Sequence, residues 1–175
     1  MVRRDRQIHS GRRDEPPPTH AVVFVGASSI AKWTSLARDF PGVHTINRGF
    51  GGSELADSVF YVDRIVIPYQ PRTVVVYAGD NDLKAGKSSE TVAADFKAFR
   101  TKIHAALPAA KIVFIGIKPS PSRWDIREKG LKANALIAAE ARHATEYRRR
   151  LEAVILEIFK DMPAGKFLDC GAADG

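Results

Sequence analysis

Four short runs of apolar, mostly β-branched residues recur along this chain of 175 residues and constrain its fold more than any other feature. Each run has a continuous β-branched character rather than an alternating one, which is typical of a strand covered on both faces of a parallel sheet. The runs are AVVFVG from Ala21, VHTIN from Val43, RTVVVYAG from Arg72 and KIVFIGIKP from Lys111. A weaker fifth run, KFLDC, starts at Lys166.

Amphipathic patterns separate these runs. Apolar residues recur about every 3.6 positions over residues 30–40, 54–69 and 89–107, and again from 124 to about 159. In the last range, Gly130 and the charged stretch 140–150 argue against one unbroken helix. The alternation of strand and helix predicts a three-layer α/β/α domain, with helices on both faces of a parallel sheet of about five strands.

Composition is that of one soluble globular domain, with 45% apolar and 27% charged residues. No apolar run approaches the roughly 18–20 residues of a membrane span, and the basic N-terminus has no apolar stretch after it. We therefore expect no membrane span, no secretory signal and a cytoplasmic location. Cys170 is the only cysteine, which excludes an intramolecular disulfide and a cysteine-based zinc site. The composition of residues 1–18 predicts a disordered, basic and proline-rich arm, which precedes a domain over residues 19–175.

The formal charge of +7 raises the question of a nucleic-acid partner. Much of the excess lies in the arm and in Arg148–Arg150, without interleaved aromatic residues. A solvated charge run is the better interpretation, and we expect a small-molecule partner rather than nucleic acid. The competing hypothesis is DNA binding through the arm, which would be salt-sensitive and would vanish on deletion of residues 1–18.

Polar, glycine-rich segments follow the runs, and the carboxyl ends of parallel strands are where open α/β sheets bind ligands. They are GASS after the first run, NRGFGGS after the second, GDND after the third and KPSPS after the fourth. A GxGxxG motif fails at Glu54, and the GxSxG elbow fails at Ile30. All four segments are expected to converge on one crevice.

The segment GASSIAKW, from Gly26 to Trp33, resembles the first block of the SGNH, or GDSL-like, hydrolases, of which G-S-S-S-I followed by tryptophan is a common variant. NRGFGGS looks like the second block, and GDND matches the third block, G-x-N-D. The resemblance covers about residues 21–138. It implies a flavodoxin-like fold and ester hydrolysis through an acyl-serine intermediate, with no cofactor and no metal.

Residue by residue, the resemblance implies that Ser28 is the nucleophile and that Gly52 and Asn81 are oxyanion donors. The positions expected to line the substrate or brace the loops are Ala27, Ser29, Asp80 and Asp82. Taken singly, these residues also suit simpler roles, such as a helix cap for the serines or turns for the glycines and Asn81. Their occurrence in the family's order favours the hydrolase interpretation. Neither the ester substrate nor the oligomeric state follows from these residues.

The family's fourth element, D-x-x-H, supplies the general base and its orienting acid, and the 175 residues contain no such motif. Without a base, a serine hydroxyl is a weak nucleophile at neutral pH. His143, three residues after Glu140, and His104 are the substitutes within the sequence, although both suit a solvated helix face. Two alternatives stay open. The domain could bind an acyl or carbohydrate ligand without turnover, or the sequence could be a fragment of a longer esterase.

Overall fold

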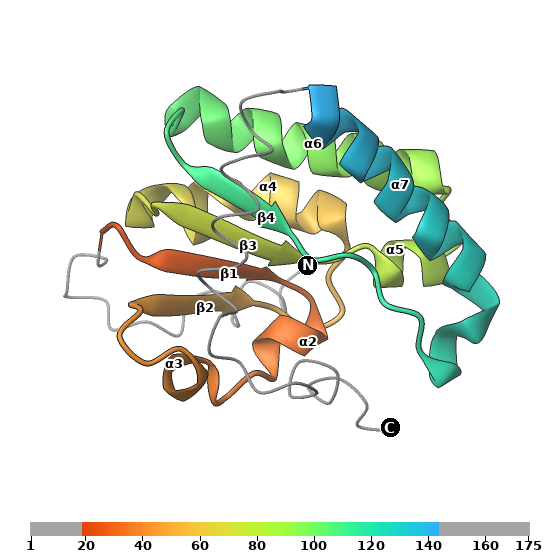
Figure 1. Ribbon diagram of the computed structural model, residues 1–175, viewed down its shortest axis with the longest axis horizontal. Coiled ribbons are helices and arrows are strands. Elements are labelled where there is room, and N and C mark those ends of the chain that lie inside the picture. Colours follow the sequence, from red (N-terminus) through yellow and green to blue (C-terminus); the bar gives the residue numbers. More distant parts are fainter. Residues whose placement is uncertain (1–18, 144–175) are drawn as a thin grey trace.

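The computed structural model describes residues 19–143, which form a parallel sheet of four strands with helices on both faces (Figure 1). The strands are β1 (Val22–Gly26), β2 (Thr45–Gly49), β3 (Thr73–Tyr77) and β4 (Lys111–Phe114), in the spatial order β2-β1-β3-β4. The four main apolar runs are thus confirmed as strands. The fifth run, the arm and the predicted helix beyond His143 lie outside the described residues.

Strand β1 pairs in parallel with both β2 and β3, so the three strands end side by side. Gly26, the last residue of β1, is opposite Gly49 of β2 and Tyr77 of β3. This strand order is that of flavodoxin-like domains, in which the chain turns back between β1 and β3 and leaves a crevice at their carboxyl ends. The predicted fold class is confirmed.

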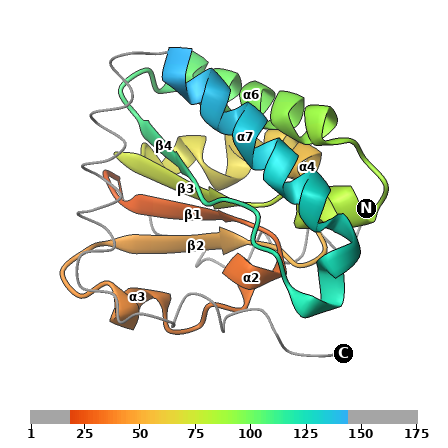
Figure 2. The same ribbon diagram turned by 45° about the vertical axis from the view of Figure 1, so that its right-hand side comes forward.

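Three long helices cover one face of the sheet, and two short ones cover part of the other (Figures 1 and 2). The long helices are α4 (Leu55–Ile65), α6 (Ser89–Ala106) and α7 (Arg127–His143), and the short ones are α2 (Ser28–Ala31) and α3 (Leu36–Asp39). The strand side chains buried toward the long helices are Val23, Val25, Val74, Val76 and Ile112. Those on the opposite face are Val22, Phe24, Val75, Tyr77 and Val113. Both faces are apolar, as the continuous runs predicted.

The predicted single helix over residues 30–40 is wrong, because α2 ends at Ala31 and α3 begins only at Leu36. The side-chain amide of Asn47 donates to the Ile30 carbonyl (2.6 Å), and the Thr34 N–H donates to Lys32 rather than to Ile30 (2.8 Å). The Ile30 carbonyl also accepts from the Trp33 N–H at 3.0 Å, in the tighter turn that closes α2. Asn47, a residue of the next strand, thus binds the end of α2, which local periodicity cannot show.

The other helical predictions need smaller corrections. Helix α6 is confirmed, whereas the 54–69 pattern divides into α4 and the 3₁₀ turn η1 (Ile67–Tyr69), where Pro68 lacks the N–H that would continue an α-helix. The GDND segment, taken as a loop, forms the one-turn helix α5 (Asp80–Lys84).

After β4 comes the 3₁₀ segment η2 (Pro121–Ile126), and α7 then runs through Gly130 without a break. A Cβ at Gly130 would lie 3.3 Å from Ile117 Cγ2, so glycine allows close packing there rather than ending the helix. Over residues 19–143, none of the helices combines the length and the apolar character needed to cross a membrane.

Candidate functional site

Ser28 is the first residue of α2, directly after the carboxyl end of β1. The turn requires Gly26, which has φ +151°, because a Cβ there would lie 2.0 Å from the Tyr77 carbonyl oxygen. Ala27 occupies the cap position and is buried, while Ser28 and Ser29 are half-buried. Neither serine caps α2 through its side chain, since α2 has no side-chain cap hydrogen bond. The geometry places a serine hydroxyl at the edge of the sheet where ligands bind.

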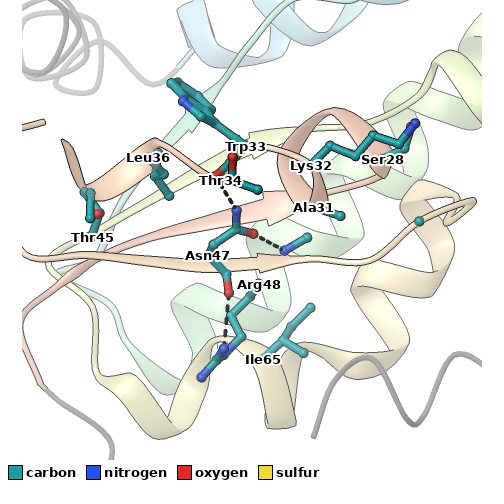
Figure 3. A pocket seen from close by; sticks show the side chains of 13 residues that line it. Ser28, Ala31, Lys32, Trp33, Thr34, Leu36, Thr45, Asn47, Arg48 and Ile65 are labelled. Carbon is teal, nitrogen blue, oxygen red and sulfur yellow. Dashed lines mark hydrogen bonds between the residues drawn. The ribbon is translucent and has the colours of Figure 1, made fainter. Parts of the chain in front are cut away.

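Asn47 connects the segment that carries α2 to the end of β2, and Figure 3 shows its side-chain hydrogen bonds to Trp33 and Gly49. Its amide nitrogen donates to the Ile30 carbonyl, and its amide oxygen accepts from the Gly49 N–H at 2.9 Å. Gly49 is required because a Cβ there would lie 2.3 Å from the Ala31 nitrogen. Sequence reasoning did not single out Asn47, although its place at the end of a predicted strand was the available signal.

Asn81 is the second residue of α5, which follows β3. Its side-chain nitrogen donates to the Ser53 carbonyl at 2.9 Å, and its side-chain oxygen accepts from Arg123 Nη2 at 2.8 Å. The Asn81 N–H donates to Asp80 Oδ1 (3.0 Å), while Arg123 Nη1 lies 3.3 Å from Asp80 Oδ2. Asp80 and Arg123 therefore surround the Asn81 side chain. Arg123 was absent from the predicted site residues.

Gly52 lies next to Ser53, in the turn between β2 and α4, and is exposed with φ +70°. Two hydrogen bonds connect this turn to its neighbours: the Phe50 N–H donates to Gly26 (2.9 Å), and Asn81 donates to Ser53. The segments that carry Ser28, Gly52 and Asn81 are thus joined through backbone carbonyls. The structure brings these three predicted residues to one end of the sheet.

Asp82 is fully buried and braces the start of α4, where the Leu55 N–H reaches both carboxylate oxygens at 3.1 and 3.0 Å. Lys87 Nζ lies 2.9 Å from Asp82, 3.1 Å from Glu54 and 3.2 Å from Asp95. Burial raises the pKa of Asp82 above its ordinary value, against the opposing effect of the Lys87 hydrogen bond. Burial alone would lower the pKa of Lys87, but its carboxylate partners outweigh burial and raise it. Sequence reasoning missed Lys87.

An open pocket of about 840 Å³ starts at Ser28 and follows β2, which is one of the two edge strands of the described sheet (Figure 3). Its lining contains two cations, Lys32 and Arg48, and no carboxylate. Gly52 and Asn81 do not line it, so Ser28 alone of the three predicted catalytic residues borders this pocket. The lining residues are Ser28, Ala31, Lys32, Trp33, Thr34, Leu36, Ala37, Thr45, Asn47, Arg48, Gly49, Gly51 and Ile65.

The histidine side chains within the described part of the chain lie away from this end of the sheet. His20 and His44 precede β1 and β2, and His104 Nε2 lies 3.1 Å from the carbonyl of Ala110, which precedes β4. The side chain of His143 is outside the described part, and Glu140 pairs with Arg100 at 3.0 Å. Over residues 19–141, therefore, no histidine side chain is placed beside Ser28.

A family model described as the GDSL-like Lipase/Acylhydrolase family matches residues 11–170. Platelet-activating factor acetylhydrolase IB subunit alpha2 of Gallus gallus is 26% identical over 147 residues, which are 79% of this chain and 60% of the relative. The Homo sapiens protein of the same name is 28% identical over 124 residues, 66% of this chain and 52% of the relative. The chain thus spans less than two thirds of the length of the curated relatives it matches.

Two solved structures support the fold. A GDSL-like lipase from Bacteroides thetaiotaomicron matches with a TM-score of 0.65 and 20% identity, over 82% of this chain and 74% of that one. A psychrotrophic esterase, EstA from Pseudoalteromonas sp., matches with a TM-score of 0.57 and 18% identity, over 69% of this chain and 73% of that one. At these identities the likeness concerns the arrangement of strands and helices.

Proposed function

The chain belongs to the GDSL-like lipase/acylhydrolase family, and from that premise we propose that it hydrolyses carboxylic esters with Ser28 as the nucleophile. One observation carries the proposal: Ser28 directly follows β1, and Asn81 follows the adjacent parallel strand β3, so both residues lie at the carboxyl end of the sheet. Acyl transfer requires a nucleophile together with a fixed hydrogen-bond donor.

In the proposed reaction, Ser28 Oγ attacks the ester carbonyl carbon while a general base takes the hydroxyl proton. The carbonyl oxygen becomes an oxyanion, toward which the Ser28 N–H, the Gly52 N–H and the Asn81 side chain donate. The bond to the alcohol oxygen then breaks, and that oxygen takes the proton as the alcohol leaves. Water attacks the acyl-serine in the same way and releases the acid and the free serine.

The proposal has two versions, which differ in whether a general base for Ser28 is present. Since the described histidine side chains lie near the amino ends of the strands, a histidine base for Ser28 would come from outside residues 19–141. The second version is a domain that binds the ester without turning it over. It is favoured by the lack of a D-x-x-H motif in the 175 residues.

The pocket suggests which part of the ester it receives. The pocket lining exposes more apolar than polar surface, but Lys32 and Arg48 add positive charge to the pocket without a carboxylate in its lining to neutralise that charge. We propose that it holds a polar or anionic alcohol group and that the acyl group is short. The curated relatives are named acetylhydrolases, which makes acetyl esters the first substrates to test.

The test is release of p-nitrophenolate from p-nitrophenyl acetate at neutral pH, in the pre-steady state and the steady state. We expect Ser28→Ala to lose steady turnover by about 1,000-fold or more, and the neighbouring control, Ser29→Ala, to keep most of it. A Ser28-dependent burst without turnover would show that Ser28 is acylated but that the acyl-serine is not hydrolysed. No release that depends on Ser28 would contradict the nucleophile role and leave the ligand-binding version, and activity lost in Ser29→Ala but kept in Ser28→Ala would contradict the choice of serine.

A further inference from the structure

Arg123 reaches the candidate oxyanion donor from a separate part of the chain. It lies in η2, after β4, and its Nη2 donates to Asn81 Oδ1 at 2.8 Å across 42 positions of sequence. Its Nη1 lies 3.3 Å from Asp80 Oδ2, the neighbour of Asn81. The Arg123 backbone departs from helical geometry within η2, with φ −133° and ψ 32°. One guanidinium thus contacts both side chains at the start of α5.

These contacts give the Asn81 amide a single orientation. The oxygen accepts from the guanidinium, and one N–H donates to the Ser53 carbonyl at 2.9 Å. A flipped amide would direct its N–H groups at the cationic guanidinium and its oxygen at a carbonyl oxygen, so both contacts would become repulsive. In the observed orientation the second N–H of the amide remains to donate to a substrate.

The charge of Arg123 also acts on the strength of that donor. A hydrogen bond from a cation to the amide oxygen draws electron density from the nitrogen, which strengthens its N–H groups as donors. The side chain of Arg123 is 29% exposed and that of Asp80 is 19% exposed, so water screens this interaction only in part.

We propose that Arg123 is a positioning residue, which orients the Asn81 side chain as an oxyanion donor and polarises it. This inference rests on the proposed function, since it concerns the same site. It adds a residue from the segment after β4 to a site whose predicted members follow β1, β2 and β3. Arg123 acts through Asn81, and a change at Arg123 should therefore be felt in turnover more than in substrate binding.

The kinetic test uses Arg123→Ala, Arg123→Lys and Asn81→Ala with p-nitrophenyl acetate. We expect Arg123→Ala to lower kcat by about 10- to 100-fold, with KM changed by less than about twofold. Lysine, which keeps the charge but offers a single point donor, should restore part of the loss. The double variant Arg123→Ala/Asn81→Ala should be no slower than Asn81→Ala, because Arg123 has nothing left to position. Fully additive losses would overturn the proposal.

The matched control is Lys84→Ala. Lys84 pairs with Asp125 at 2.9 Å and so joins the same two segments, α5 and η2, without contacting Asn81. We expect it to leave kcat unchanged. If it lowers kcat as much as Arg123→Ala does, attachment of η2 rather than orientation of Asn81 is the cause, and the proposal fails.

A second measurement does not depend on turnover. The side-chain amide signal of Asn81 in a ¹H–¹⁵N spectrum can be assigned by its loss in Asn81→Ala. Arg123→Ala should move this signal toward that of a solvated asparagine and speed its hydrogen exchange, while Lys84→Ala should do neither. An unchanged signal in Arg123→Ala would overturn the positioning role. If the wild-type protein shows no Ser28-dependent reaction, the proposed function fails, and this spectrum still decides the role of Arg123.

Discussion

Replacing Lys87 with methionine should cost the folded state about 3–5 kcal/mol at pH 7, the usual effect of leaving a buried charge without its partner. Methionine keeps much of the length of the side chain while it removes the ammonium group. The carboxylate of Asp82 is then left with the Leu55 N–H as its remaining partner outside its own residue. Because Asp82 is fully buried, water cannot replace the lost contact.

The expected loss of stability in Lys87→Met comes almost entirely from one of the three ion pairs that Lys87 makes. The pair with Asp82 is 2.9 Å long, and its carboxylate is 0% exposed. The pairs with Glu54 and Asp95 involve carboxylates that are 33% and 25% exposed, so each contributes at most about 1 kcal/mol. The double variant Asp82→Asn/Lys87→Met, which removes both charges, should therefore recover a large part of the loss.

The loss of stability in Lys87→Met should depend on pH, and the direction of this dependence follows from the pKa of Asp82. Without Lys87, burial raises the pKa of Asp82 in the folded state further above its ordinary value. A folded-state pKa above the unfolded one gives a contribution to stability that is present below the unfolded pKa and is lost as pH rises through the folded pKa. The deficit of Lys87→Met should thus grow as pH rises from about 4, the ordinary range of a carboxyl group, toward neutrality.

The assay is urea unfolding followed by circular dichroism at acidic and neutral pH, with equal m-values required for comparison. Lys84→Met, which removes an exposed ion pair with Asp125, is the control and should leave the free energy of unfolding nearly unchanged. A loss below about 1 kcal/mol in Lys87→Met at pH 7, or a loss that does not change with pH, would refute the reasoning.

Two further predictions concern the packing of α2 on β2. Gly49→Ala should destabilise the fold by about 3 kcal/mol or more, since its Cβ would meet the Ala31 backbone at 2.3 Å, whereas Gly86→Ala, with open space and φ +97°, should cost about 1–2 kcal/mol in urea unfolding. Asn47→Ala removes the hydrogen bonds to Ile30 and Gly49 and should cost about 1–3 kcal/mol. Faster proteolysis between α2 and α3 should accompany this loss, and an unchanged cleavage rate would count against the role given to Asn47.

The two central strands, β1 and β3, were predictable because they are buried on both faces and are therefore continuously apolar, so local composition alone identifies them. The edge strand β2 is only partly buried and carries Asn47 and Arg48. The positions of Ser28, Gly52 and Asn81 at one end of the sheet also followed from sequence, since parallel strands with polar ends bring those ends together. The catalytic roles of these residues stay predictions.

The rest depends on contacts between residues far apart in sequence. The end of α2 is bound by Asn47, 17 positions beyond Ile30, and no periodicity within residues 30–40 reports this contact. Arg123 contacts Asn81 only because η2 folds back over α5, and the buried partner of Asp82 at Leu55 lies 27 positions away. Gly130 misled the prediction for a different reason, because a helix accommodates a glycine where another chain segment packs tightly against it.

The central claim, that Ser28 is the nucleophile of an ester hydrolase, is tested most directly by a fluorophosphonate, which reacts covalently with activated serines. The protein and its Ser28→Ala variant would be treated in parallel, and intact mass followed by peptide mapping would locate the adduct. We predict a single adduct on Ser28 that is absent from the variant. An adduct on Ser29 or on any other residue, or no adduct at all, would contradict the claim.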